Sequence, residues 1–339
     1  MKINHAILHV LDFTSGVTVF SNAELCLDDS VIAHFVERHM RYARQDASAQ
    51  HASFISESSF KNELEQYFCG RVPFMDFAYQ IADFFANELA CADNQQSCDL
   101  LICDFDEDDP EEGGDSSRWF GVLMLTSRLA FMHEVNSSTG EPVNQIARHY
   151  AILPNPSQKV AAMALVRARD FSILLSDKPR KIKGEDCNLI EDRLLQCESS
   201  ISSKETIDTV NRIIEDVADE FALNSTVALA SAKSAIIDQA ETNSEISPYE
   251  IGKKVFEDAP QLARRYQEEV NRELLPEKVE VERKNIQRVA RNQKIKTDTG
   301  IEITFPSEYV ENNDYINFVN MPNGLISIEL KNIGSIENK

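Results

Sequence analysis

The sequence predicts an α+β protein with an N-terminal mixed antiparallel sheet and helices, a central helical region and a small C-terminal β-rich unit. Three observations lead to this prediction. Near the N-terminus apolar and polar residues alternate, as they do in half-buried strands. From Ser202 onward apolar residues recur at helical spacing behind clear N-cap residues. The C-terminal residues hold two hairpin turn signals between short runs rich in β-branched residues.

Length and composition indicate a folded protein with more than one domain. The chain has 339 residues, of which 42% are hydrophobic and 27% are charged, as in ordinary globular proteins. At about 150 residues per domain, this length predicts roughly two domains. From the changes in pattern we predict an α+β domain at 1–200, a helical region at 201–293 and a β-rich unit at 294–339.

Strand and helix patterns both occur in the first 100 residues. The run Asp28–Ser30 supplies N-caps for a helix that ends near Arg44, because short polar side chains accept hydrogen bonds from free helix amides. A Phe-rich helix that opens at Pro73 repeats its apolar residues at helical spacing, which indicates a core-facing side. The predicted elements are strands at 3–10 and 17–20 and helices at 30–44, 58–68 and 73–89.

An acidic stretch separates the next two strand-like runs, 100–105 and 119–125. Residues 104–115 include eight acidic residues and a Gly-Gly pair, which together predict a hairpin with a long acidic tip. Because Gly and Pro break this stretch, we favour a solvated tip over a rigid site. Further strands are predicted at 146–153, 159–168 and 171–175.

The helical region begins with two strong start signals. Ser202 and Glu205 form a capping box. Ser247 is an N-cap that is followed by Pro248 at the first helical position. Beyond this region, the C-terminal unit is predicted to contain two hairpins, with turns at 297–300 and 321–324.

The overall charge restricts the classes of partner. The formal net charge is −22, which argues against general binding to nucleic acid or to anionic membranes. A local basic surface is still allowed, because charges more than about 8 Å away are screened at physiological salt. Since we find neither a transmembrane stretch nor a signal peptide, we expect a cytoplasmic protein without membrane contact.

A basic run at 283–296 stands out against this acidic background. The run contains no acidic residue, and on a helix four of its basic residues share one arc while Ile286 and Val289 lie opposite. We therefore predict an amphipathic helix whose basic face binds DNA phosphates; the alternative is a solvated helix face. The candidate DNA-binding residues are Arg283, Lys284, Arg288, Arg291, Lys294 and Lys296.

A second basic cluster lies in a predicted loop at 177–184. Its residues Arg180, Lys181 and Lys183 are secondary candidates for phosphate contact. A short cluster of this kind is a weaker signal than the run at 283–296.

No motif for catalysis, a cofactor or a metal is found in the sequence. Phosphate-binding Gly-rich loops, nucleophile elbows and zinc-binding helices are all missing. The seven cysteines are scattered and odd in number, which argues against a disulfide framework and a structural zinc site. We therefore predict neither catalytic nor metal-binding residues, and no cofactor.

Several short segments of the chain match segments of a known protein family, and the C-terminal ones do so most specifically. They are 7–12 (ILHVLD), 97–101 (SCDLL), 120–125 (FGVLML), 194–197 (LLQC), 295–303 (IKTDTGIEI), 306–309 (PSEY), 323–328 (NGLISI) and 331–333 (KNI). This set resembles the bacterial nucleoid-associated protein family often called NdpA, over nearly the whole chain. The acidic insert at 106–115 is longer than the family pattern leads us to expect.

The resemblance implies a cytoplasmic, non-enzymatic protein of the bacterial nucleoid. It implies binding to double-stranded DNA through phosphate contacts, with little sequence preference, and contact with DNA-processing proteins of the nucleoid. The sequence leaves a homo-oligomer open. An acidic hairpin tip would repel DNA, so we expect that edge of the molecule to face away from it.

Two other functions are also compatible with the sequence. The first is an acidic adaptor protein that recruits chromosomal enzymes and contacts DNA only indirectly. The second is a metal-dependent nuclease, since clustered carboxylates can hold Mg²⁺. Its candidate residues are Asp104, Asp106 and Asp108.

Overall fold

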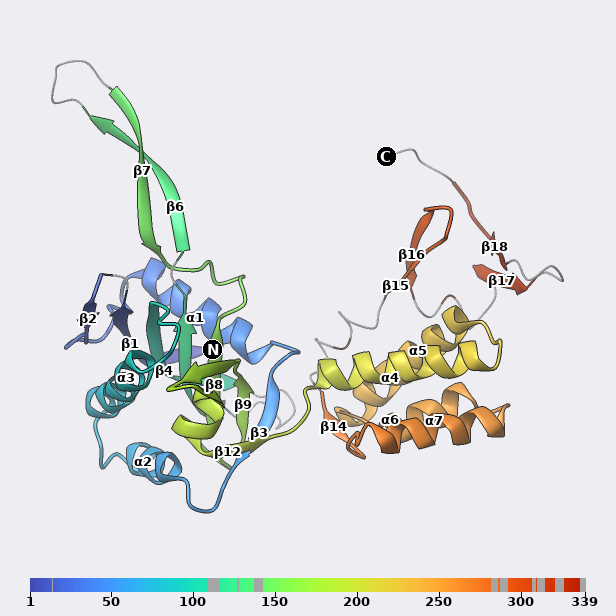
Figure 1. Ribbon diagram of the computed structural model, residues 1–339, viewed down its shortest axis with the longest axis horizontal. Coiled ribbons are helices and arrows are strands. Elements are labelled where there is room, and N and C mark those ends of the chain that lie inside the picture. Colours follow the sequence, from blue (N-terminus) through green and yellow to red (C-terminus); the bar gives the residue numbers. More distant parts are fainter. Residues whose placement is uncertain are drawn as a thin grey trace. The chain divides into compact units, whose positions relative to one another are not determined.

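Two compact units, Met1–Ser200 and Ile201–Lys339, make up the chain. We call them unit 1 and unit 2 and describe each by itself. The computed structural model describes residues 1–13, 15–108, 116–126, 128–136, 143–281, 286, 292–306, 309, 315–320 and 326–335. It confirms an α+β fold (Figure 1).

Unit 1 is built on an eight-stranded sheet with the order β12-β3-β9-β8-β5-β4-β1-β2. Every neighbouring pair in this sheet is antiparallel. The strands are β1 (Lys2–Asp12), β2 (Val17–Val19), β3 (Gln50–Phe54), β4 (Cys98–Asp108), β5 (Ser116–Leu125), β8 (Ala162–Arg167), β9 (Ile173–Ser176) and β12 (Cys197–Ser199).

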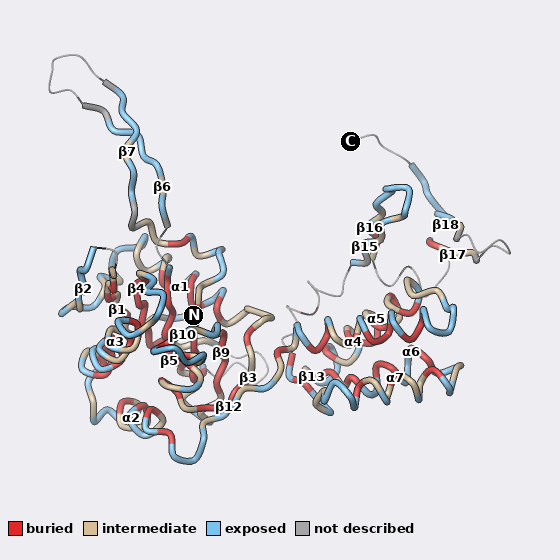
Figure 2. The backbone as a smooth tube through the Cα atoms, viewed as in Figure 1, coloured by how far each residue is buried: buried red, intermediate tan, exposed pale blue. Residues whose placement is uncertain are grey.

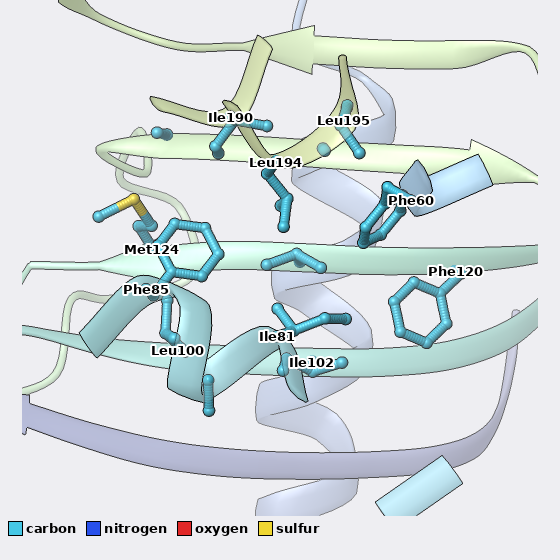
Figure 3. Close-up of a cluster of buried hydrophobic side chains, with 14 of the residues drawn as sticks. Phe60, Ile81, Phe85, Leu100, Ile102, Phe120, Met124, Ile190, Leu194 and Leu195 are labelled. Carbon is cyan, nitrogen blue, oxygen red and sulfur yellow. The ribbon is translucent and has the colours of Figure 1, made fainter. Parts of the chain in front are cut away.

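Helices cover both faces of this sheet. They are α1 (Ser30–Arg44), α2 (Ser59–Phe68), α3 (Phe74–Ala90) and the π-helical turn η2 (Leu189–Leu195). Alternation along β4 sends Leu101 and Cys103 towards α1, and Leu100 and Ile102 towards α2, α3 and η2. Figure 3 shows Leu100 and Ile102 among side chains from α3 and η2. The sheet is therefore the middle of three layers.

The predicted helix starts of unit 1 are confirmed. Asp29 caps α1 by accepting a hydrogen bond from the backbone amide of Val31 at 2.8 Å. Ser58 caps α2 in the same way, through the amide of Lys61 at 3.1 Å. Helix α3 follows Pro73. Side-chain caps thus mark where α1 and α2 begin, whereas α3 starts after Pro73 without a side-chain cap.

The acidic hairpin is confirmed as the pair β4–β5. The two strands are in register from Asp99↔Leu125 to Asp108↔Ser116. Since both strands extend beyond the predicted runs, Asp104, Asp106 and Asp108 lie on a strand and not in a loop. The tip itself, 109–115, lies outside the described residues.

A second hairpin, β6 (Arg128–Asn136) and β7 (Val143–Ile152), follows β5 and forms a two-stranded sheet of its own. It extends away from the rest of unit 1 in Figure 1, and Figure 2 shows most of its length as exposed. The sequence predicted a strand at 146–153 and missed its partner β6. Because both faces of the ribbon meet solvent, no buried side enforces an alternating pattern.

The segment predicted as a basic loop at 177–184 is largely a strand. Strands β10 (Pro179–Ile182) and β11 (Glu185–Asn188) form a hairpin with Ile182 opposite Glu185. The two turn residues, Lys183 and Gly184, have φ angles of 54° and 82°. Positive φ at both positions is what a tight two-residue hairpin turn requires, and Gly supplies it readily.

Unit 2 begins with a helical region. Its helices are α4 (Ser203–Glu220), α5 (Ser225–Asn243), α6 (Pro248–Val255) and α7 (Pro260–Arg272), with a short pair β13 (Glu245–Ile246) and β14 (Val279–Glu280). The predicted capping box of Ser202 and Glu205 is present at α4. Ser247 caps α6, as predicted. In the described part of the chain, no helix has the length and hydropathy needed to span a membrane.

The remaining strands of unit 2 form two hairpins, as predicted. They are β15 (Asn292–Lys296) with β16 (Glu302–Pro306), and β17 (Ile316–Asn320) with β18 (Ile326–Leu330). Ala230 of α5 packs against Phe305 and Ile316 from these hairpins. Other residues of α5, among them Ala235 and Ile236, pack into the helical core. Helix α5 therefore buries two sides, which suits its many alanines.

The prediction of one helix through 283–296 is wrong at its C-terminal end. Residues 292–296 form strand β15, which pairs with β16 from Asn292↔Pro306 to Lys296↔Glu302. Ile295 faces Ile303 across the hairpin, and both pack beside Phe305. Pairing with a second apolar strand therefore prevails over the helical spacing of a short basic run.

Candidate nucleic-acid interface

The structure describes only part of the basic run. Arg283, Lys284, Arg288 and Arg291 lie outside the described residues. Ile286, which the helical pattern placed on the apolar side, is buried in the helical core of unit 2 with 2% of its surface exposed. The run is therefore anchored to the core of unit 2 at this position.

Lys294 and Lys296 lie on the solvent side of the β15–β16 hairpin. Alternation along β15 turns Ile295 towards Phe305 and the α5 helix, and turns the two lysines the other way. The start of the strand is tied to α5, because Lys233 Nζ donates a hydrogen bond to the carbonyl oxygen of Asn292 at 3.3 Å. Both lysine side chains are mostly exposed.

One carboxylate serves both lysines. Glu302 lies 2.8 Å from Lys294 Nζ and 3.7 Å from Lys296 Nζ. The hydrogen bond from Lys294 and its positive charge lower the pKa of Glu302, so this carboxylate is ionised at neutral pH. Two ammonium groups against one carboxylate leave a net positive charge on this face of the hairpin.

The secondary candidates differ in how accessible they are. Arg180 is half-buried, its Nη2 lies 3.6 Å from the sulfur of Met124, and its Nε is buried without a hydrogen-bond partner. Lys181 and Lys183 are exposed. Their ammonium groups form no ion pair with any described residue. Only these two lysines are therefore available for a ligand.

The β10–β11 hairpin is nearly balanced in charge. Residues 177–188 contain four basic and three acidic residues, and Asp186 lies directly across from Lys181. The position of this hairpin suits contact with DNA better than its charge does, because it lies far from the acidic tip. Strand β9 ends at Ser176, which aligns through Met163 with Leu123 near the end of β5. The hairpin thus leaves the sheet at the end opposite the acidic tip.

Of the three carboxylates proposed for a nuclease site, that of Asp104 is held by hydrogen bonds within the protein. Asp104 is completely buried and accepts hydrogen bonds from Arg118 (2.7 Å from Nη2), from Asn4 (3.1 Å) and from the hydroxyl of Tyr67. Burial raises the pKa of Tyr67, which keeps this hydroxyl protonated as a donor. Asp106 also accepts a hydrogen bond from Asn4, at 2.9 Å. This network occupies both oxygens of Asp104, which a metal ion could reach only by displacing these donors.

No group of three or more His, Cys, Asp or Glu side chains suited to a metal ion occurs among the described residues. Asp108 is exposed at the end of β4. The described residues therefore do not bring the three nuclease candidates together as a metal site.

An exposed apolar surface on the β6–β7 ribbon was not predicted from the sequence. Phe131 is 61% exposed and Ile146 is 81% exposed, and both lie on one face of the ribbon. Arg148 lies opposite Phe131, with its guanidinium 5.6 Å from the centre of that ring. Solvent-exposed aromatic and arginine side chains of this kind are typical of protein interfaces.

One comparison with known proteins gave a match. The model of the family described as nucleoid-associated protein YejK matches residues 7–338, nearly the whole chain. No curated protein and no solved structure matches the chain. The family match confirms the resemblance to nucleoid-associated proteins.

Proposed function

This chain belongs to the family of nucleoid-associated protein YejK, and on that premise we propose that it binds double-stranded DNA through phosphate contacts. The binding has little sequence preference and involves no enzymatic step. The protein acts at the nucleoid, in the bacterial cytoplasm, where it also meets DNA-processing proteins.

The observation that carries this proposal is the basic run at 283–296. It contains six basic residues and no acidic residue in a chain with a net charge of −22. Contacts from Lys and Arg to phosphates give affinity but carry no sequence information. A nucleoid protein that uses such a run would therefore bind DNA of any sequence.

The described part of the run supports the same proposal. Lys294 and Lys296 extend from a paired strand into solvent, and among the described residues Glu302 is the one carboxylate that pairs with them. Acidic residues more than about 8 Å away do not prevent contact, because salt screens their charge at physiological ionic strength. A hairpin held against α5 presents its lysines from a fixed support.

Salt dependence tests this proposal. If all six basic residues contact phosphates, the logarithm of affinity falls with the logarithm of salt concentration with a slope of about −5. Replacing Arg288 and Arg291 with Ala should weaken this slope by about 1.8, because two contacts are lost. Affinity for duplex DNA is measured between low and physiological salt.

The matched control removes two arginines that are already ion-paired. Arg212 lies 2.8 Å from Glu273, and Arg272 lies 2.7 Å from Glu269. The Arg212→Ala/Arg272→Ala variant has the same net charge as the test variant and should keep the wild-type slope. Equal slopes for wild type and the Arg288/Arg291 variant would remove this segment from the DNA interface.

The exposed ribbon favours a second candidate function, that of an adaptor with only indirect DNA contact. Phe131 and Ile146 offer apolar surface to a protein partner, and the acidic remainder of the chain suits basic chromosomal enzymes. Purified protein that fails to retard duplex DNA at low salt would favour this function over direct binding. Retardation with the predicted salt slope would favour direct binding.

A further inference from the structure

Helix α1 of unit 1 is basic, although the chain as a whole is acidic. Between Ser30 and Arg44 it carries three arginines and one glutamate, Glu37. This helix is separate in sequence from the basic run at 283–296 and from the β10–β11 hairpin. Its charge therefore calls for a separate explanation.

The inner side of α1 is held firmly against the sheet. Val36, Met40 and Ala43 are buried in the core between helix and sheet. Gly121 of β5 makes this close approach feasible, since a Cβ there would lie 2.8 Å from Leu165 Cδ2 and 3.0 Å from Met40 Sδ. The outer side of the helix is thus presented on a rigid support.

The outer side of α1 forms a continuous polar stripe. Its residues recur at intervals of three and four, so they lie above one another on one face of the helix. They surround a shallow depression of about 420 Å³. The lining residues are His34, Glu37, Arg38, Arg41, Tyr42 and Gln45.

The charges on this stripe are only partly offset. Glu37 accepts a hydrogen bond from Arg41 one turn later. Among the described residues, the partner of Arg38 is neutral: it is Tyr42, whose hydroxyl accepts a hydrogen bond at 3.5 Å and whose ring centre lies 5.8 Å from the guanidinium. Arg44 is not part of the stripe, because it bonds Glu107 at 3.1 Å and stacks on Trp119. The stripe keeps a net positive charge at Arg38.

We propose that this stripe is a second DNA-contacting surface, in which Arg38 and Arg41 bind phosphates of one strand. The proposal rests on the proposed function, since it assumes that the chain binds duplex DNA. From His34 to Gln45 the helix rises about 16 Å, which matches about five phosphates at 3.4 Å per nucleotide along the axis. Planar guanidinium groups bind phosphate oxygens in pairs.

The side of the helix, and not its N-terminus, meets the phosphates. Asp28 and Asp29 lie at the N-terminal end of α1, and Asp29 accepts a hydrogen bond from a free amide there. Their negative charges oppose an anion at that end. The arginines lie further along the helix, so the contact follows its exposed side.

A second copy of the chain is the competing occupant, because an acidic segment could also dock on basic residues. Duplex DNA is favoured as the occupant, because it carries one negative charge per about 1.7 Å of helix axis. Each phosphate contact also releases about 0.9 counterions, which drives binding. Glu107, next to the acidic tip, is already bonded to Arg44. The two occupants are separated by the experiment.

The experiment uses the full-length protein with Arg38→Gln/Arg41→Gln. The expected result is a salt slope that is weaker by about 1.8 and an affinity for duplex DNA that is roughly tenfold or more lower at 0.1 M salt. The control, Arg212→Gln/Arg272→Gln, removes the same charge from ion-paired residues and should bind like wild type. Glu37→Gln should shift affinity the opposite way, because it frees Arg41.

Three outcomes would overturn the proposal, and they differ in what else they affect. If wild type binds but the Arg38/Arg41 variant keeps its slope, the α1 surface is excluded and the proposed function stands. If wild type does not bind duplex DNA at low salt, the proposed function fails and this surface with it. If the substitutions leave DNA binding unchanged but lower the molecular mass measured by sedimentation at low salt, the stripe is an interface between copies of the chain.

Discussion

The single residue Glu302 controls how much positive charge the β15–β16 hairpin presents to solvent. Its carboxylate lies within 4 Å of both Lys294 and Lys296. Exposed ion pairs of this kind contribute little to stability, because solvent and salt screen them. Their effect on a DNA interface is larger, because phosphates must compete with Glu302 for the same two ammonium groups.

Replacing Glu302 with Gln should therefore strengthen DNA binding. The variant frees Lys294 and Lys296 for phosphates, and the salt slope should steepen by up to about 1. Affinity for duplex DNA is measured at several salt concentrations. The control is Glu257→Gln, which removes the same charge from an exposed residue of unit 2. An equal gain in both variants would show an effect of net charge alone.

His39 is a buried residue that makes the stability of unit 1 depend on pH. It lies on α1 with 1% of its surface exposed, and burial lowers its pKa from 6.5 to about 4. In the unfolded chain the His39 imidazole binds a proton below about pH 6.5, whereas in the folded chain it binds one only below about pH 4. Its contribution is thus fully present above pH 6.5 and is lost as the pH falls towards 4.

We expect wild type to lose about 2 kcal/mol more stability than His39→Leu between pH 7 and pH 5, as an order of magnitude. Leu fills the site without a titrating group, so the difference between the two proteins isolates His39. Urea unfolding at the two pH values measures it. Parallel losses in wild type and variant would contradict this account of His39.

At the scale of elements, helices α6 and α7 of unit 2 approach unusually closely at Gly252. A Cβ on this residue would lie 2.0 Å from the ring of Tyr266. That ring is fully buried, and its hydroxyl donates a hydrogen bond to the carbonyl oxygen of Pro248 at 2.9 Å. The ring therefore cannot move aside without losing this bond.

Gly252→Ala should destabilise unit 2 by about 3 kcal/mol or more, because overpacking in a tight core forces side chains and backbone to shift. Gly334→Ala is the control, since nothing lies within 4 Å of the added Cβ and its φ is ordinary. Thermal unfolding compares the two variants with wild type. A small effect at Gly252 would show that the helices separate easily.

Sequence patterns predicted most elements whose signals are local. The caps at Asp29, Ser58, Ser202 and Ser247 each lie beside the amides that they bond, so the sequence contains the whole interaction. Strand β6 was missed because a ribbon exposed on both faces needs no apolar alternation. The helical spacing of the basic run extended into β15, whereas the hairpin turn at 297–300 correctly indicated a strand there, because pairing with β16 decides its conformation from outside the segment.

The candidate site was harder to predict than the fold. Lys294 and Lys296 were predicted as DNA-binding residues from a continuous basic run, and that assignment stays a prediction; their sharing of Glu302 follows only from strand register. The arginines of α1 were passed over because helical spacing disperses them along the sequence. Net charge counted for each predicted helix would have revealed them.

At the scale of the whole molecule, a net charge of −22 coexists with basic surfaces on both units. Unit 1 carries the arginines of α1 on one face of its sheet. Its acidic hairpin β4–β5 places negative charge at one end of that sheet. Unit 2 carries the basic run and the lysines of β15. DNA contact in this account depends on local surfaces, and the acidic remainder limits non-specific attachment elsewhere.

The most direct test of the central claim is the salt dependence of duplex DNA binding by the purified full-length protein. We expect binding at low salt to two duplexes of unrelated sequence, with similar affinities and a slope of about −5 or steeper. Absence of binding at low salt, or an affinity that does not change with salt, would contradict it.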